Sequence, residues 1–401
     1  MEVTPLKHAA GKKCEMGATI TGLDLNNISD EDLAALKDAI YRYQYVNIKN
    51  QHDLEPVKHW ELVTRLDPTA PPVHGHGTLK EFNKTGGFLS KRVVQGIPGA
   101  ENVRLIGKGY QGADHFGIKD FTAAGGASND YHKYPPSAES FAAGNTQFQR
   151  WHMDAPLYDR EPPHFTALRA VKCPVGPDLQ VNWDDGSNQS MKCKPGQTAF
   201  VSNTQLYELL NDEEKMLADN SWVEYAPFPY MWVENCKGRT NGLGLETEGK
   251  EHAMEEMPEW DQEKIKTVRP LYFPLYENAS IDVRNLKYPM VWKTPTGKKA
   301  LQVHGLAVRK MFLKATPTSE VQEVDDVVKI RKLLHDWQER IIKPEYVFMG
   351  PVEEGDVQMW DNWSVFHTAV DYPDHYGPRS MHQVNLGASD KPVGPMPISV
   401  S

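Results

Sequence analysis

Cysteine is scarce in this sequence. Four cysteines occur in 401 residues, and no two of them form a Cys-x-x-Cys pair, which argues against a zinc ribbon or a dithiol redox motif. Cys173 and Cys193 could pair if they lay on adjacent strands. Widely scattered cysteines nevertheless favour a reduced, intracellular protein.

Long apolar runs are also missing. No stretch of about 18 apolar residues suggests a membrane span. The first residues, Met-Glu-Val-Thr-Pro, lack the basic and then apolar pattern of a secretory signal. We therefore expect a cytoplasmic protein with no membrane partner.

Positive charge is in the minority. Lys and Arg number 44 against 54 Asp and Glu, a formal net charge of −10, whereas nucleic-acid binding needs a basic stripe. This balance argues against a nucleic-acid partner and leaves room for a local cationic pocket around a small anion. The oligomeric state stays open, a homo-oligomer included.

The sequence does contain a β-rich pattern with helices towards its ends. Apolar residues at helical spacing indicate helices, and short apolar or alternating runs between Pro/Gly turns indicate strands. The expected helices are 30–44, 52–65, 205–219 and 324–342. The expected strands are 17–24, 45–48, 147–154, 165–172, 179–183, 197–202, 356–360, 364–367 and 380–386.

The fold class follows from this order. Residues 66–145 are rich in Gly, Pro, Asn and Lys, which predicts long loops. Strands dominate the rest, so we predict a mainly β fold with helical decoration (α+β) and a jelly-roll core. We expect a single domain over residues 1–401, in which about 225–345 is an insertion between core strands.

His152 and Asp154 lie two residues apart in Trp-His-Met-Asp. On a strand such residues point to the same face, so both could reach one metal ion. His367, which is 215 residues further on, is a candidate third ligand. Two His and one carboxylate form the facial triad of non-haem Fe(II) oxygenases, although the same three ligands also allow a zinc hydrolase or a non-catalytic metal site.

Arg379 follows His367 by twelve residues. A hairpin that turns at 371–378 would place its guanidinium beside the metal. There it could bind the distal carboxylate of 2-oxoglutarate through two parallel hydrogen bonds. A simple zinc hydrolase has no need of such an arginine, so Arg379 favours Fe(II) with 2-oxoglutarate.

The chain resembles the taurine-dioxygenase-like branch of the Fe(II)/2-oxoglutarate dioxygenases. Three stretches carry the resemblance: 17–24 with the following helix and 45–49, His152-Met-Asp154 with Pro162-Pro163, and 360–367 through Arg379. The resemblance implies a double-stranded β-helix that binds Fe(II) and 2-oxoglutarate, uses O₂, and releases succinate and CO₂.

Two departures from that branch concern single residues. The taurine enzymes carry a second Arg four residues after the 2-oxoglutarate Arg, where this chain has Gln383. A neutral amide is a poor sulfonate ligand but can donate and accept hydrogen bonds together. Many members also place a Thr on the strand that follows the first two ligands, and here Gln180 takes that place as the candidate 2-oxoglutarate ligand.

A closer resemblance is to the fungal xanthine dioxygenases of the same branch. Their pattern of Arg, then Gln and Asn four and six residues on, reads Arg379, Gln383 and Asn385 here. A local match at 117–120 adds Lys119. By this resemblance Lys119, Gln383 and Asn385 would contact a purine, and the expected reaction is the hydroxylation of xanthine to uric acid. The alternative is another small molecule, such as a secondary metabolite, an amino-acid derivative or a sulfonate.

Overall fold

A large mixed sheet forms the centre of the computed structural model, which describes residues 1–75, 94–154, 160–183, 185–226, 236–239, 241–243 and 287–398. Its strands, in spatial order, are β1 (Glu2–Pro5), β2 (Ala18–Thr21), β3 (Tyr45–Ile48), β21 (Val357–Asp361), β10 (Phe165–Lys172), β23 (Arg379–Asn385), β5 (Ala100–Tyr110) and β4 (Gln95–Ile97), with β8 (Thr122–Ala124) beside β5. Strands from both ends of the chain thus lie side by side.

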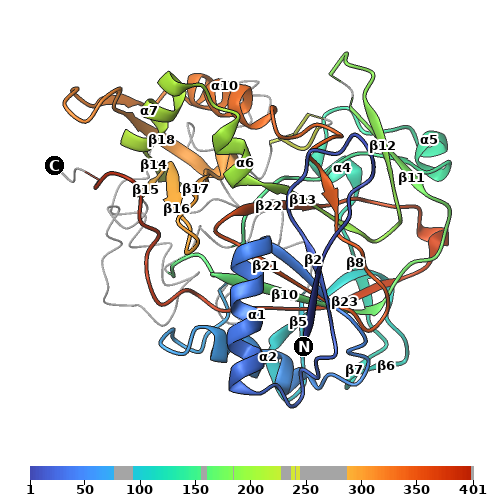
Figure 1. Ribbon diagram of the computed structural model, residues 1–401. Helices are drawn as coiled ribbons and strands as arrows, with labels where there is room; N and C mark the ends of the chain where they lie inside the picture. The colour runs from blue at the N-terminus through green and yellow to red at the C-terminus, as the bar shows by residue number, and fades with distance from the viewer. Residues whose placement is uncertain are drawn as a thin grey trace, which may run out of the picture.

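Two helices, α1 (Asp30–Tyr43) and α2 (Pro56–Leu66), cover one face of this sheet, the outer face (Figure 1). Ser29 caps α1, because its hydroxyl accepts a hydrogen bond from the Asp32 amide. Apolar side chains of both helices, such as Leu36 and Leu62, pack with the outward residues of the strands, such as Val103. Burial of this apolar surface stabilises the contact.

The opposite, inner face meets a second sheet of β20 (Phe348–Met349), β13 (Thr198–Ser202) and β22 (Val365–Ala369). One apolar cluster joins the two sheets, with Phe200 from β13 packed among Tyr45, Trp360 and Met381 of the large sheet. The expectation of a mainly β protein with helices is confirmed.

Smaller sheets surround this pair. One consists of β9 (Asn145–Thr146), β11 (Leu179–Asn182) and β12 (Ser190–Cys193). Another consists of β15 (Lys287–Pro289), β14 (Trp222–Tyr225), β18 (Val308–Leu313) and β19 (Gln322–Val324), and lies near α7 (Asp212–Asn220) and α10 (Val327–Gln338) at the upper left of Figure 1.

The expected insertion at 225–345 is described in part, because residues 227–235, 240 and 244–286 lie outside the described residues. The single-domain organisation with this insertion stays a prediction. No helix of the described part is long and apolar enough to cross a membrane.

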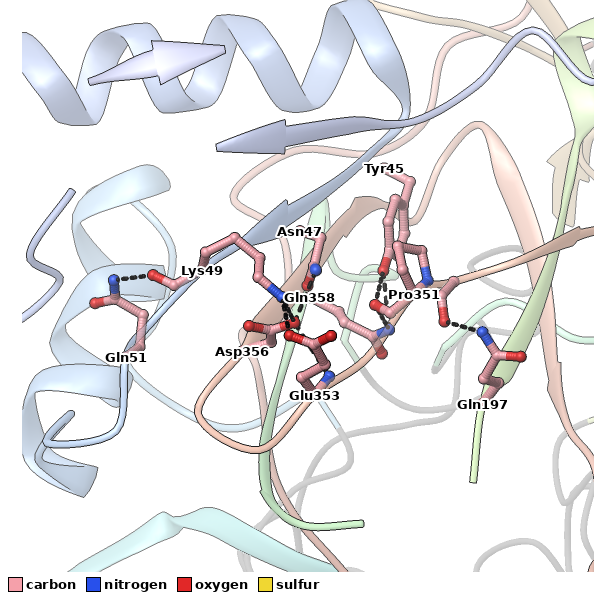
Figure 2. Close-up of polar contacts among 10 residues, drawn as sticks. Tyr45, Asn47, Lys49, Gln51, Gln197, Pro351, Glu353, Asp356 and Gln358 are labelled. Carbon is pink, nitrogen blue, oxygen red and sulfur yellow. Dashed lines mark hydrogen bonds and ion pairs between the residues drawn. The ribbon is translucent and has the colours of Figure 1, made fainter. Parts of the chain in front are cut away.

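A polar network ties β3 to the loop before β21 (Figure 2). The carboxylate of Asp356 accepts hydrogen bonds from the Asn47 amide at 2.9 Å and from Lys49 Nζ at 2.7 Å. Next to it, Gln358 donates to the Tyr45 hydroxyl at 2.8 Å. These bonds satisfy buried polar groups and fix the Tyr45 ring, which packs 4.9 Å from Phe200.

The expectation of loops throughout 66–145 is wrong at β5, an eleven-residue strand inside the large sheet. Its outward residues, Val103 and Leu105, are apolar and belong to the outer cluster. Its inward residues include Arg104 and Lys108, and glycines follow at 107 and 109. Charged residues on the inner face, and glycines in the second half of the strand, hide the apolar alternation that marks a strand.

Two further boundaries differ from expectation. Residues 147–154 do not form one strand but isolated bridges, at Phe148 with Val370 and at His152 with His367. The expected helix 205–219 is two helices, α6 (Asn203–Glu208) and α7. Asn211 separates them, because its side chain caps α7 in a reciprocal pair of hydrogen bonds with Glu214.

Candidate functional site

His152 and His367 lie opposite each other on two paired segments. His152 N donates to the His367 carbonyl at 3.1 Å, and His367 N donates to the His152 carbonyl at 2.9 Å. The two imidazole rings are 4.2 Å apart between centroids. A segment from the middle of the chain and β22 near its end are therefore held together by backbone bonds at the candidate ligands.

Asp154 brings a carboxylate to both imidazoles. Its Oδ1 lies 3.7 Å from His367 Nε2 and 4.0 Å from His152 Nε2. One ligand atom from each of the three side chains fits within 4.8 Å of the others. Asp154 and His367 are buried, with side chains 3% and 7% exposed, whereas His152 is 38% exposed, so the site opens on the His152 side.

Two neighbours hold Asp154 in place. The Thr166 hydroxyl donates to Asp154 Oδ2 at 2.6 Å. The Asn362 amide accepts from the Asp154 backbone N–H at 2.7 Å and donates to the Asp154 carbonyl at 3.0 Å. The side chain of Asn362 thus takes the place of a neighbouring strand for this irregular segment. The Oδ1 atom of Asp154 remains directed to the two histidines.

The histidines are arranged to present Nε2. His152 Nδ1 lies 2.7 Å from the Arg150 carbonyl, which can only accept, so Nδ1 carries the proton and Nε2 has a free lone pair. Burial, with His152 and His304 nearby, holds the pKa of His367 well below its usual range. His304 is also buried, and burial lowers its pKa to about 3. Neutral imidazoles are the form that binds metal ions.

The donor set fits a metal ion. Two imidazole nitrogens and one carboxylate oxygen, presented to one point, match the facial triad that leaves open positions on non-haem iron. Thr166 and the Arg150 carbonyl supply the outer hydrogen bonds that orient metal ligands.

Arg379 begins β23 and points to the inner face. Its Nε donates to the Gly196 carbonyl at 2.9 Å, and one terminal nitrogen lies 3.4 Å from Thr198 Oγ1. Within the described part of the chain, no carboxylate pairs with it. Thr198 lies two residues before Phe200, whose ring stacks on His367 at 6.0 Å. Along β13, one strand step of about 7 Å separates Thr198, which the guanidinium approaches, from Phe200, which is the cross-strand partner of His367.

Gln383 and Asn385 follow Arg379 on the same face of β23. Asn385 is the cross-strand partner of Thr166, which places it beside Asp154. Its Oδ1 accepts from the Gly75 N–H at 3.2 Å, while its buried Nδ2 has no hydrogen-bond partner among the described residues. Gln383 is only partly buried and stands opposite Arg104 on β5.

Two other predicted residues lie apart from this group. Lys119 is on the hairpin of β6 (Asp114–His115) and β7 (Ile118–Lys119), where it pairs with Asp114 and is 68% exposed. That hairpin contacts His382 through His115 at 2.9 Å. His382 alternates with Gln383 and points to the outer face, so the structure does not bring Lys119 to the site.

Gln180 lies on the face of β11 opposite to its buried neighbours Leu179 and Val181. Among the described residues, no hydrogen bond joins Gln180 to Arg379, and Thr198 stands beside Arg379 instead. Sequence reasoning missed Thr198, Thr166 and Asn362. Asn362 could have been noticed within the quoted 360–367 motif; the two threonines carry no local signal.

Comparison with known proteins agrees with this geometry. The family model of the taurine catabolism dioxygenase TauD, TfdA family, matches residues 2–385. The chain is 38% identical over 406 residues to the alpha-ketoglutarate-dependent dioxygenase bsc9 of Alternaria brassicicola. This alignment covers 100% of this chain and 97% of that protein. It is 34% identical over 397 residues to the alpha-ketoglutarate-dependent xanthine dioxygenase xan-1 of Neurospora crassa, in an alignment over 98% of this chain and 88% of that protein.

Solved structures share the fold at low identity. The crystal structure of a putative alpha-ketoglutarate-dependent taurine dioxygenase from Burkholderia xenovorans aligns with a TM-score of 0.51 at 17% identity, over 98% of this chain and 91% of that one. From the family match and these relatives, the chain belongs to the TauD/TfdA family and is a 2-oxoglutarate-dependent dioxygenase.

Proposed function

We propose that the protein binds Fe(II) and hydroxylates a small organic molecule, with xanthine as the first candidate, while 2-oxoglutarate is converted to succinate and CO₂. One observation carries this proposal. The ligand atoms of His152, Asp154 and His367 converge, and Arg379 approaches Thr198 on β13, the strand paired with the one that carries His367. This guanidinium has no carboxylate partner among the described residues.

The metal belongs to His152, Asp154 and His367 in this proposal, and the two facing sheets form the double-stranded β-helix that carries them. Bound Fe(II) supplies the activation of O₂ for oxidation of a C–H bond. The chain supplies two imidazoles and one carboxylate, and it leaves positions open for a bidentate 2-oxo acid and for O₂.

Arg379 binds the distal carboxylate of 2-oxoglutarate. Among the residues that the structure describes, no carboxylate pairs with its guanidinium, and Thr198 offers a hydroxyl at the same place. Phe200 and Trp360 are buried beside His367 and exclude water from the space between Arg379 and the ligands. With its distal carboxylate at Arg379, the cosubstrate would have its 2-oxo end at the metal.

Gln383 and Asn385 bind the substrate. Asn385 Nδ2 is a buried donor that meets no partner in the described part of the chain, and it lies next to Thr166 and hence to Asp154. Xanthine presents carbonyl acceptors and N–H donors, and two amides can match both kinds. The names of the Neurospora crassa relative and of the Schizosaccharomyces pombe relative xan1, 34% identical, support this choice.

A different small molecule is the second candidate. The relatives bsc9 and fc-dox, the latter from Phomopsis amygdali, are each 38% identical and are named as dioxygenases without a substrate. Their identity to this chain is higher than that of the xanthine dioxygenases named above. A substrate other than a purine would use the same metal and the same Arg379.

Binding of the cosubstrate tests the first part of the proposal. Anaerobic protein with Fe(II) and 2-oxoglutarate should develop a weak visible charge-transfer band, which Asp154→Ala should abolish. Folded wild-type protein without this band would remove the assignment of the metal and cosubstrate site.

Product analysis tests the substrate. Succinate release should depend on xanthine and should be accompanied by urate, which is detected by its ultraviolet absorbance. A parallel panel of other purines, amino-acid derivatives and sulfonates gives the comparison. Absence of xanthine-dependent succinate release, in protein that shows the charge-transfer band, would reject xanthine and favour the second candidate.

A further inference from the structure

The hydroxyl of Tyr372 is buried without a hydrogen-bond partner. Tyr372 lies in the turn between β22 and β23, its residue is 2% exposed, and its oxygen meets no donor or acceptor among the described residues. Buried polar groups are normally paired, since an unpaired one loses its bonds to water without replacement. A partner that is absent from the protein chain itself would account for this hydroxyl.

Lys108 fixes the tyrosine from one side. Its Nζ lies 5.0 Å from the centroid of the Tyr372 ring and donates to the Tyr372 carbonyl at 2.7 Å. The same ammonium pairs with Asp371 at 2.9 Å and Asp374 at 2.7 Å. The two carboxylates of the turn are therefore taken by Lys108, which is the cross-strand partner of Arg379.

Arg379 lies within electrostatic range of Tyr372. The guanidinium donates to the Gly196 carbonyl and approaches the Thr198 hydroxyl. Burial raises the pKa of Tyr372 to about 12, the positive Arg379 opposing the rise, so the phenol keeps its proton near neutral pH. The Arg379 guanidinium and the Thr198 hydroxyl are thus neighbours, and Tyr372 lies in the same part of the fold. A carboxylate is the ligand that accepts several such bonds at once.

We propose that the Tyr372 hydroxyl donates a hydrogen bond to the distal carboxylate of 2-oxoglutarate, beside Arg379. This inference rests on the proposed function, because it needs the cosubstrate in that place. The tyrosine is a binding residue that adds affinity and selectivity for a dicarboxylate, and both aspartates of the turn are paired with Lys108.

The experiment compares two 2-oxo acids in anaerobic, Fe(II)-loaded, full-length protein. The charge-transfer band is titrated with 2-oxoglutarate and with 2-oxobutanoate, which lacks the distal carboxylate. Tyr372→Phe should weaken 2-oxoglutarate binding about ten- to a hundredfold, as expected for loss of a hydrogen bond to a charged group. Binding of 2-oxobutanoate should be unchanged.

Tyr376→Phe is the matched control. Tyr376 lies in the same turn, but its ring packs on Gly176 and its hydroxyl lies near Gly144. Its removal should leave both titrations unchanged. Equal 2-oxoglutarate affinity in wild type and Tyr372→Phe would overturn the inference, as would an equal loss for both 2-oxo acids. A wild type that gives no band with either acid would overturn the proposed function and this inference with it.

Thermal unfolding supplies a second readout that needs no iron chemistry to proceed. Without ligand, Tyr372→Phe removes an unpaired buried hydroxyl, so its melting temperature should equal or exceed that of the wild type. The rise in melting temperature on adding 2-oxoglutarate to the Fe(II) protein should be smaller in the variant. A lower melting temperature of the ligand-free variant would show that the hydroxyl has a structural partner, and would contradict the inference.

Discussion

Thr166 donates a hydrogen bond to Oδ2 of Asp154 at 2.6 Å, and Oδ1 of the same carboxylate faces both His152 and His367. The Thr166 hydroxyl thus binds Oδ2 and leaves Oδ1 of Asp154 available to a metal ion. Because Thr166 sits in the middle of the large sheet, paired to Asn385, the orientation of Asp154 is tied to the rigid strands rather than to its own irregular segment.

Thr166→Val should weaken Fe(II) binding. The substitution keeps the shape but removes the donor to Asp154, and loss of such an outer hydrogen bond typically costs about 10- to 100-fold in metal affinity. Competition with a coloured chelator measures the affinity. Thr294→Val is the control, because Thr294 is also buried but lies in the turn between β16 (Val291–Lys293) and β17 (Lys299–Leu301). Equal Fe(II) affinity in wild type and Thr166→Val would contradict the role.

Asn385→Asp should raise the KM for xanthine about 10- to 100-fold. The aspartate keeps the acceptor for the Gly75 N–H but loses the free Nδ2 donor and adds a charge next to a carbonyl of the substrate. Affinity for 2-oxoglutarate should stay the same. Asn182→Asp, on β11 outside the site, is the comparison. A KM that does not change in Asn385→Asp would remove this side chain from the substrate pocket.

The spacing of His152 and Asp154 predicted that the two side chains lie together, but the regular strand on which this prediction rested is absent. The His-x-Asp pattern predicted a regular strand, yet the segment is held by one bridge to His367 and by the Asn362 amide. His152 and Asp154 are still two positions apart on extended backbone, so their side chains point the same way and reach the same point. Arg379 faces inward because side chains alternate along β23, and its role as a 2-oxoglutarate ligand stays a prediction.

Lys119 and Gln180 show that a local sequence match does not determine where a residue lies in the fold. Lys119 rests on a short match in a hairpin, and the place of that hairpin is set by the contact of His115 with His382, 267 residues away. Gln180 was placed by the resemblance, as the residue that stands where many family members have a Thr on the strand after the first two ligands. The residue beside Arg379 is Thr198, because β13 pairs with β22. Such register between distant strands is a property of the whole sheet and is not encoded in a local motif.

Asp356→Ala should lower the free energy of unfolding by about 3 kcal/mol, as in the loss of one partner from a buried ion pair. Its side chain is 2% exposed and accepts from both Lys49 and Asn47 (Figure 2). Its loss would leave the buried Asn47 amide without this acceptor and Lys49 with only the exposed Glu353. Glu353→Ala is the matched control, since Glu353 pairs with the same Lys49 but is 78% exposed, and should cost at most about 1 kcal/mol. Urea denaturation measures both, and equal losses would contradict the importance of burial here.

Asp361 should make stability fall as pH rises through the weakly acidic range. Burial raises the pKa of this carboxyl from 3.8 to about 6, opposed by hydrogen bonds from Ser364 and the Trp363 N–H. The folded protein therefore binds this proton more tightly than the unfolded chain. The resulting stabilisation is full below about pH 4 and is lost as pH rises through about 6.

Asp361→Asn isolates this effect, because the amide keeps an acceptor for the Trp363 N–H and does not titrate. The difference in unfolding free energy between Asp361→Asn and wild type should shift in favour of the variant by about 3 kcal/mol between pH 4 and 7, which follows from about two pKa units. Other carboxyls titrate in both proteins and cancel in the difference. Asp361 alternates with the inward Trp360 and so faces away from the metal ligands, which means that this pH dependence should appear equally in protein with and without Fe(II). A flat difference across that range would mean that Asp361 is ionised in the folded protein throughout, with its charge satisfied by the Ser364 hydroxyl and the Trp363 N–H.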